Sequence, residues 1–128
     1  MNDYVLAILG LLGIFIVGVI CYGFLFKGFV GDKNEVKLTV GRFLVAGVGM
    51  YVVSLIFIYL FRHVTIGTMT GVAKGVDLGL LAGVGFMAIP IFADAPYFKS
   101  GKMGIEWAVI VNWLLSFVVL GIIVGALA

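Results

Sequence analysis

Long runs without a charged residue alternate along the chain with short segments that hold the charges. Three runs are unbroken, namely Tyr4–Phe26, Phe43–Phe61 and Ala108–Ala128, and a shorter one, Leu78–Phe92, reaches similar length with its flanks. A helix that crosses a bilayer needs about 20 apolar residues. The pattern therefore predicts one domain, an all-α integral membrane four-helix bundle. The spans that we expect cover residues of about 4–26, 43–61, 75–97 and 108–128.

Glycine recurs at every fourth position between Gly67 and Gly83 in "GTMTGVAKGVDLGLLAGVG". In water each interior glycine costs a helix about 1 kcal/mol. A bilayer imposes the helix regardless, and small residues then let two helix backbones approach closely. We expect Gly67 and Gly71, among threonines, to lie in a polar loop or short interfacial helix outside the hydrocarbon. The expected helix-packing residues are Gly75, Gly79 and Gly83 in the third span, with Gly121 and Gly125 of "GIIVG" in the fourth.

The glycine pattern leaves two packing partners open, another helix of the same bundle or a second chain in a dimer or larger oligomer.

The composition indicates a bilayer environment in both cases, because 64% of the residues are hydrophobic and 11% are charged. A soluble chain of this size buries only about two-thirds of the surface it exposes unfolded. The net charge of +2 is too small to indicate a nucleic-acid partner. With one cysteine and one histidine, the sequence predicts neither a metal site nor a cofactor.

The basic residues are spread unevenly over the connections. Arg62 and Lys74 lie in the second connection, and the termini hold none. Cytoplasmic loops carry an excess of Lys and Arg, so the pattern predicts that both termini face outward from the inner (cytoplasmic) membrane of a bacterium or archaeon. The start "MNDY" lacks the basic residues of a signal peptide, so we expect the first span to be retained. The first and third connections hold the other six basic residues, Lys27, Lys33, Lys37, Arg42, Lys99 and Lys102.

Two short motifs resemble a known family. "YGFLFKGFV" (Tyr22–Val30) closes the first span and "GLLAGVGF" (Gly79–Phe86) lies in the third. The arrangement resembles the bacterial family of small four-helix membrane proteins catalogued as domain of unknown function 1761. The chain departs from that family at Phe24, where proline is usual, and at Cys21, where tryptophan is expected. The resemblance implies a four-helix membrane fold and no established activity; the matching positions are Tyr22, Gly23, Leu25, Phe26, Gly85 and Phe86.

Asp94 follows Pro90 near the end of the third span. Proline lacks the amide that would bond to the carbonyl of Phe86, so we expect a kink there. Asp94 is interpreted as an interfacial carboxylate beside Arg42, Lys99 or Lys102, with a proton or cation site as the alternative. At the other membrane surface, Lys74 and Asp77 are spaced to pair, and His63 is expected to be merely interfacial.

Four uncharged polar residues, Tyr51, Ser54, Asn112 and Ser116, lie deeper in the second and fourth spans. Interhelical hydrogen bonds of about 1 kcal/mol each would explain them. A substrate path is the alternative, with Asp94, Asn112, Ser116 and Tyr51 as the candidate polar site.

No nucleophile, base or phosphate-binding loop occurs in a recognisable arrangement, so the sequence predicts no enzyme. We expect a non-catalytic membrane protein that acts through helix packing, as a homo-oligomer or as an accessory subunit of a membrane complex. Membrane lipid and other membrane subunits are the expected partners. The alternative is a small transporter or channel that uses Asp94 and Asn112.

Overall fold

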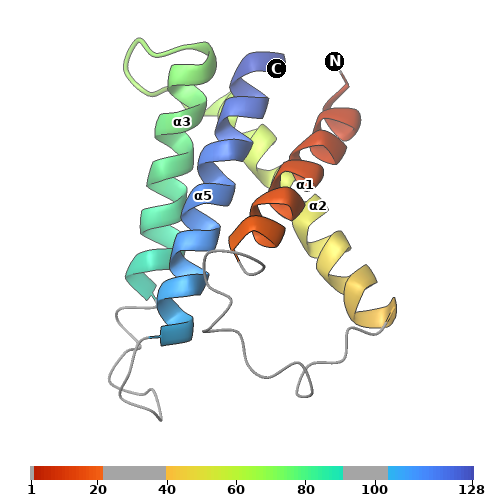
Figure 1. Ribbon diagram of the computed structural model, residues 1–128. Helices are drawn as coiled ribbons and strands as arrows, with labels where there is room; N and C mark the ends of the chain where they lie inside the picture. Colours follow the sequence, from red (N-terminus) through yellow and green to blue (C-terminus); the bar gives the residue numbers. More distant parts are fainter. Residues whose placement is uncertain (1, 22–39, 91–103) are drawn as a thin grey trace.

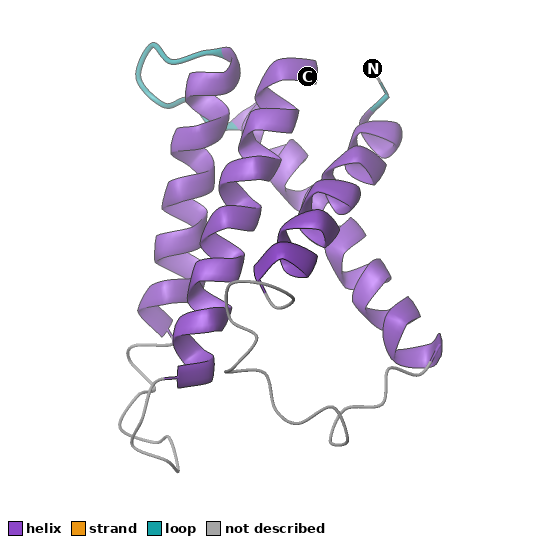
Figure 2. Ribbon diagram, in the orientation of Figure 1, coloured by secondary structure: helices purple, strands orange, loops and turns teal. Residues whose placement is uncertain are grey.

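The computed structural model describes residues 2–21, 40–90 and 104–128, and over these residues it is all-helical (Figure 2). Four of its helical segments are long and apolar enough to cross a membrane, as the sequence predicted. The third is one α-helix continued by a π-helical turn. In chain order the elements are α1 (Asp3–Ile20), α2 (Val40–His63), α3 (Gly71–Ala82), the π-helix η2 (Gly83–Ala88) and α5 (Gly104–Leu127).

The helix ends differ from the predicted spans by a few residues. Asn2 caps α1, because its Oδ1 accepts a hydrogen bond of 2.8 Å from the backbone N–H of Tyr4. The second helix extends beyond the expected 43–61 at both ends, and α3 begins at Gly71 rather than near residue 75. Residues 22–26 and 91–97 of the predicted spans lie outside the described residues.

The helices form an antiparallel bundle (Figure 1). The α3 and α5 helices lie side by side and make the most extensive contact, while α1 packs against both α5 and α2. The α2 helix has little contact with α3 or α5, and its N-terminal half leans away from them. Both ends of the described chain and the 64–70 connection lie at the same end of the bundle.

The core is apolar and lies where α1, α2 and α5 meet. Leu6, Phe57, Ile58, Leu120 and Val124 are each at most 2% exposed. The outward faces are apolar as well, with Val45 and Phe86 more than 70% exposed. In water, apolar patches of this extent drive aggregation, and a bilayer accommodates them.

A π-helical turn, η2, covers the region around Phe86 where we expected a kink. The N–H of Ile89 donates to the carbonyl of Val84, five residues back instead of four. Pro90 follows directly, and its ring would clash with a carbonyl in a regular α-helical turn, so a wider turn relieves that clash. Beyond Gly83 the helix turns Gly85 and Phe86 outward.

Candidate functional site

The α3 and α5 helices approach each other so closely that their backbones touch. A Cβ atom at Gly75 would overlap the carbonyl group of Gly121, and one at Gly121 would overlap the carbonyl group of Gly75. One turn further, a Cβ at Gly79 would overlap the carbonyl oxygen of Phe117. Backbones this close permit Cα–H···O contacts between helices. The glycines therefore contact a helix of the same chain.

The two ends of this glycine row differ from its middle. At Gly83 the nearest atom to an added Cβ would be Cδ2 of Leu114, 2.8 Å away, and that side chain can move. At the other end, a Cβ at Gly125 would lie 2.5 Å from the carbonyl oxygen of Gly71. Gly71 has φ +61° and Gly67 has φ +54°, a left-handed conformation that favours glycine. Gly67 lies in the connecting loop, as expected, whereas Gly71 starts α3 and takes part in the α3–α5 contact.

The first helix carries two further packing glycines that our sequence reasoning missed. A Cβ at Gly10 would lie 2.6 Å from Cδ1 of Leu120 and 2.9 Å from Oγ of Ser54. A Cβ at Gly13 would lie 2.7 Å from Cδ1 of Ile123. The sequence feature that could have indicated them is the short "GLLG" motif inside the first span. Its two glycines are three residues apart, so it does not share the four-residue spacing of the longer row.

Two of the deep polar residues have hydrogen-bond partners. The hydroxyl of Ser54 donates to the carbonyl of Met50 at 2.9 Å, within its own helix. The hydroxyl of Tyr51 donates to the carbonyl of Tyr4 at 3.3 Å and so links α2 to α1. Only the second of these bonds is interhelical, because a serine hydroxyl reaches the carbonyl one turn back more easily than a neighbouring helix.

Asn112 and Ser116 do not form the hydrogen bonds that we expected of them. Asn112 is 6% exposed and Ser116 is 1% exposed, both on α5. The Oδ1 atom of Asn112 and the Oγ atom of Ser116 have no hydrogen-bond partner in the described part of the chain. Tyr51 bonds to α1 instead, and no hydrogen bond among the described residues joins it to Asn112 or Ser116, so the structure does not join these three residues in one polar site.

A cavity of about 320 Å³ lies between α1, α2 and α5, within the volume range of small-molecule sites. Its walls are almost entirely apolar and include Ile14 and Gly18 of α1 together with Gly47 and Met50 of α2. Asn112 and Trp113 form the α5 wall. The Oδ1 atom of Asn112 would lie 3.9 Å from a Cβ at Gly18, so this oxygen is directed toward the α1 wall.

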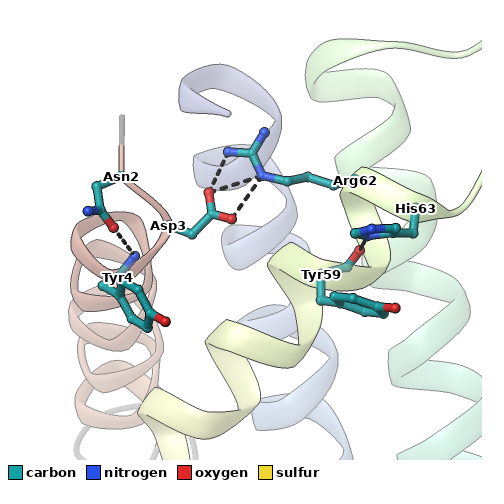
Figure 3. A network of polar contacts seen from close by, with 6 residues as sticks. All are labelled: Asn2, Asp3, Tyr4, Tyr59, Arg62 and His63. Carbon is teal, nitrogen blue, oxygen red and sulfur yellow. Dashed lines mark hydrogen bonds and ion pairs between the residues drawn. The ribbon is translucent and has the colours of Figure 1, made fainter.

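An ion pair joins the ends of α1 and α2 (Figure 3). The guanidinium of Arg62 donates through Nε to both carboxylate oxygens of Asp3, at 3.0 and 3.2 Å, and through a terminal nitrogen to Oδ1. Beside it, His63 stacks on Tyr59 with ring centroids 4.1 Å apart, and its Nδ1 donates to the carbonyl of Tyr59 at 2.9 Å. These groups bond to protein atoms, as expected of interfacial residues.

The predicted Lys74–Asp77 pair is not formed. The Nζ atom of Lys74 lies instead 4.8 Å from the ring centroid of Phe61, which is a cation–π contact between α3 and α2. Asp94, Lys99 and Lys102 lie outside the described residues, and the side chain of Arg42 is not described. Within the described ranges, no three His, Cys, Asp or Glu side chains gather as metal ligands would.

Comparison of the chain with protein-family models, with curated proteins and with solved structures finds no match. The resemblance to domain of unknown function 1761 therefore stays a prediction from short motifs.

Proposed function

We propose that this chain is a non-catalytic integral membrane protein that acts by packing against another membrane helix, supplied by a second copy or by another subunit. The observation that carries this proposal is the exposed apolar side of α2, a helix that has little contact with α3 or α5 inside the bundle.

The outer face of α2 has features that favour a helix partner over lipid alone. Val45, Val48, Gly49, Val52 and Ile56 lie on it, all exposed, and no described atom lies within 4 Å of a Cβ at Gly49. A small residue among β-branched side chains gives a stiff surface that another backbone can approach closely. By contrast, the glycines between α3 and α5 are already occupied within the chain.

Cysteine crosslinking in native membranes tests this proposal. In a Cys21→Ala background, Val48→Cys places a thiol on the outer face of α2, where Val48 is 64% exposed. Leu81→Cys, on α3 and 59% exposed, is the matched control. Mild oxidation should give a crosslinked dimer, or a product with another protein, from Val48→Cys and neither from Leu81→Cys. Equal crosslinking at both positions, or none at either, would contradict the proposal.

The same proposal places the chain in the inner membrane of a bacterium or archaeon with both termini outside. Both ends of the described chain and the 64–70 connection lie at one end of the bundle, which is the arrangement expected for an even number of membrane crossings. The basic residues of the first and third connections favour the opposite end as the cytoplasmic one.

A small transporter or channel is the second candidate, favoured by the buried and unpaired Oδ1 of Asn112. Transport measured in proteoliposomes should then disappear in both Asp94→Asn and Asn112→Leu. Persistence of transport in either variant, or an absence of transport in the wild type over a panel of monovalent cations and protons, would exclude this candidate.

A further inference from the structure

Two opposite charges lie on the outward side of α3 without pairing with each other. Lys74 and Asp77 are three residues apart, a spacing at which side chains on a helix are neighbours. The ammonium of Lys74 lies instead 4.8 Å from the ring centroid of Phe61, and the carboxylate of Asp77 is half-buried. Neither charged group forms an ion pair or a hydrogen bond within the described part of the chain. The cation–π contact therefore leaves an ammonium and a carboxylate close together, each without a group of opposite charge.

This side of α3 faces away from the bundle. Gly75 and Gly79 contact α5, and Asp77 is two residues from each, which places it about 160° from both around the helix. Lys74 and Asp77 are about 60° apart around the same axis. Leu81, one turn beyond Asp77, is 59% exposed. A partner for the carboxylate of Asp77 would therefore come from outside the bundle.

Asp77 lies at the edge of the apolar part of its span. The α3 helix begins at Gly71, six residues earlier, so Asp77 is about 9 Å along it at 1.5 Å per residue. From Leu78 onward the sequence holds no charged residue until Asp94. Lys74 is one turn closer to water, and its long stem lets the ammonium stay in the polar layer. The two charges thus lie where the headgroup region of a bilayer meets its hydrocarbon core.

We propose that Lys74 and Asp77 bind the headgroup of a phospholipid that carries a primary ammonium group. The phosphate of the lipid accepts hydrogen bonds from the ammonium of Lys74, and the lipid ammonium donates to the carboxylate of Asp77. The acyl chains then lie along the exposed apolar side of α3 that includes Leu81. The inference rests on the membrane location proposed above and is independent of whether α2 binds a partner helix.

The two charges together select this headgroup chemistry. A headgroup with a phosphate and no ammonium would bind Lys74 but bring a second negative charge beside Asp77, which is unfavourable. A trimethylated ammonium carries the positive charge but has no N–H group to donate. A Mg²⁺ or Ca²⁺ ion takes about six or more oxygen ligands. Asp77 belongs to no group of three acidic, His or Cys side chains within the described ranges.

The test compares three phospholipids with the same acyl chains, added to the purified, delipidated protein in detergent. Phosphatidylethanolamine should raise the Tm by about 4 °C or more at saturation. Phosphatidylglycerol lacks the ammonium, and phosphatidylcholine lacks the N–H donors on it, so each of these lipids should raise the Tm much less.

Four variants assign the effect to the two side chains. Asp77→Asn should lose most of the preference for phosphatidylethanolamine over phosphatidylglycerol, whereas Asp77→Glu, which keeps the charge, should retain it. Lys74→Gln should weaken stabilisation by both lipids, because the phosphate loses its partner. Asp3→Asn is the matched control and should keep the preference, since Asp3 is an acidic residue that bonds to Arg62 at the same end of the bundle.

Equal stabilisation by the three lipids, or no stabilisation by any, would overturn the proposal. An unchanged preference in Asp77→Asn, or its loss in Asp3→Asn or Asp77→Glu, would overturn it as well. A basic residue of a partner membrane helix is the other group that could neutralise Asp77, and it predicts no headgroup preference in the purified chain. Recovery of the protein in the soluble fraction would refute the membrane location itself, which the lipid comparison alone would leave standing.

Discussion

Gly75→Ala is the smallest change that tests the α3–α5 contact. The new methyl group would overlap the carbonyl oxygen of Gly121, lie 2.8 Å from its carbonyl carbon and 3.3 Å from its Cα. Because these are backbone atoms, no side-chain rotation relieves the overlap. The two helices must separate, by an amount on the order of 1 Å if ordinary contact distances are to be restored.

The cost follows from the dispersion energy lost along the interface. A contact of roughly 50 atom pairs at about 0.15 kcal/mol each is worth about 7.5 kcal/mol, and a gap of 0.5–1 Å forfeits a quarter to a half of it. The methyl group regains part of this loss through its own contacts and through the better helix propensity of alanine, which is worth at most about 1 kcal/mol. We expect Gly75→Ala and Gly79→Ala each to lower the free energy of unfolding by about 1–3 kcal/mol, the range typical of overpacked cores.

Unfolding by increasing SDS in mixed micelles, followed by circular dichroism, measures this free energy. Gly85→Ala is the matched control, because a Cβ there meets no described atom within 4 Å. It should be neutral or slightly stabilising. Gly83→Ala should cost less than Gly75→Ala, since the obstacle is the movable end of the Leu114 side chain.

The facing glycines supply a further check. In the double variant Gly75→Ala with Gly121→Ala, the helices separate once, so the loss should be smaller than the sum of the two single losses. If Gly75→Ala and Gly79→Ala unfold at the same SDS fraction as Gly85→Ala, then α3 and α5 are not in backbone contact and the reasoning is refuted.

Three other changes have defined outcomes. Asp3→Asn should cost less than about 1 kcal/mol in the same SDS titration, because the Asp3 and Arg62 side chains are 44% and 38% exposed, and a larger loss would mean that the pair is shielded from solvent. Gly67→Ala should destabilise by about 1 kcal/mol through its left-handed backbone conformation, although its surroundings are open, and a neutral result would show that the loop relaxes freely. Cysteines introduced at Asn34 and Gly67 in a Cys21→Ala background should differ in labelling of intact cells by a membrane-impermeant maleimide, with Gly67 labelled and Asn34 protected; the reverse result would invert the proposed topology.

The sequence predicted the number and type of helices well because each span is a long apolar run, and length and hydropathy alone decide such cases. It also indicated Gly75, Gly79 and Gly121 as packing residues, since four-residue spacing aligns small residues along one side of a helix. It could not name the facing helix, because that depends on how four similar apolar surfaces combine.

The polar groups were harder to anticipate for the same reason. Lys74 lies beside Asp77 in the chain, yet it contacts Phe61 of another helix, and Arg62 bonds to Asp3 almost sixty residues away. Such contacts depend on which helix ends meet at the membrane surface. Local spacing rules describe one helix at a time and contain no information about that meeting.

The position of α5 in the chain has a consequence for biosynthesis. This helix contacts each of the other three, and it is the last of the four to be synthesised. At 5–20 residues per second, the ribosome needs about 2–8 s to extend the chain from the end of η2 to the end of α5. Until α5 follows, Gly75 and Gly79 of α3 lack the helix that they contact in the folded chain. A chain that ends before α5 would therefore leave this glycine surface free to associate with other membrane helices.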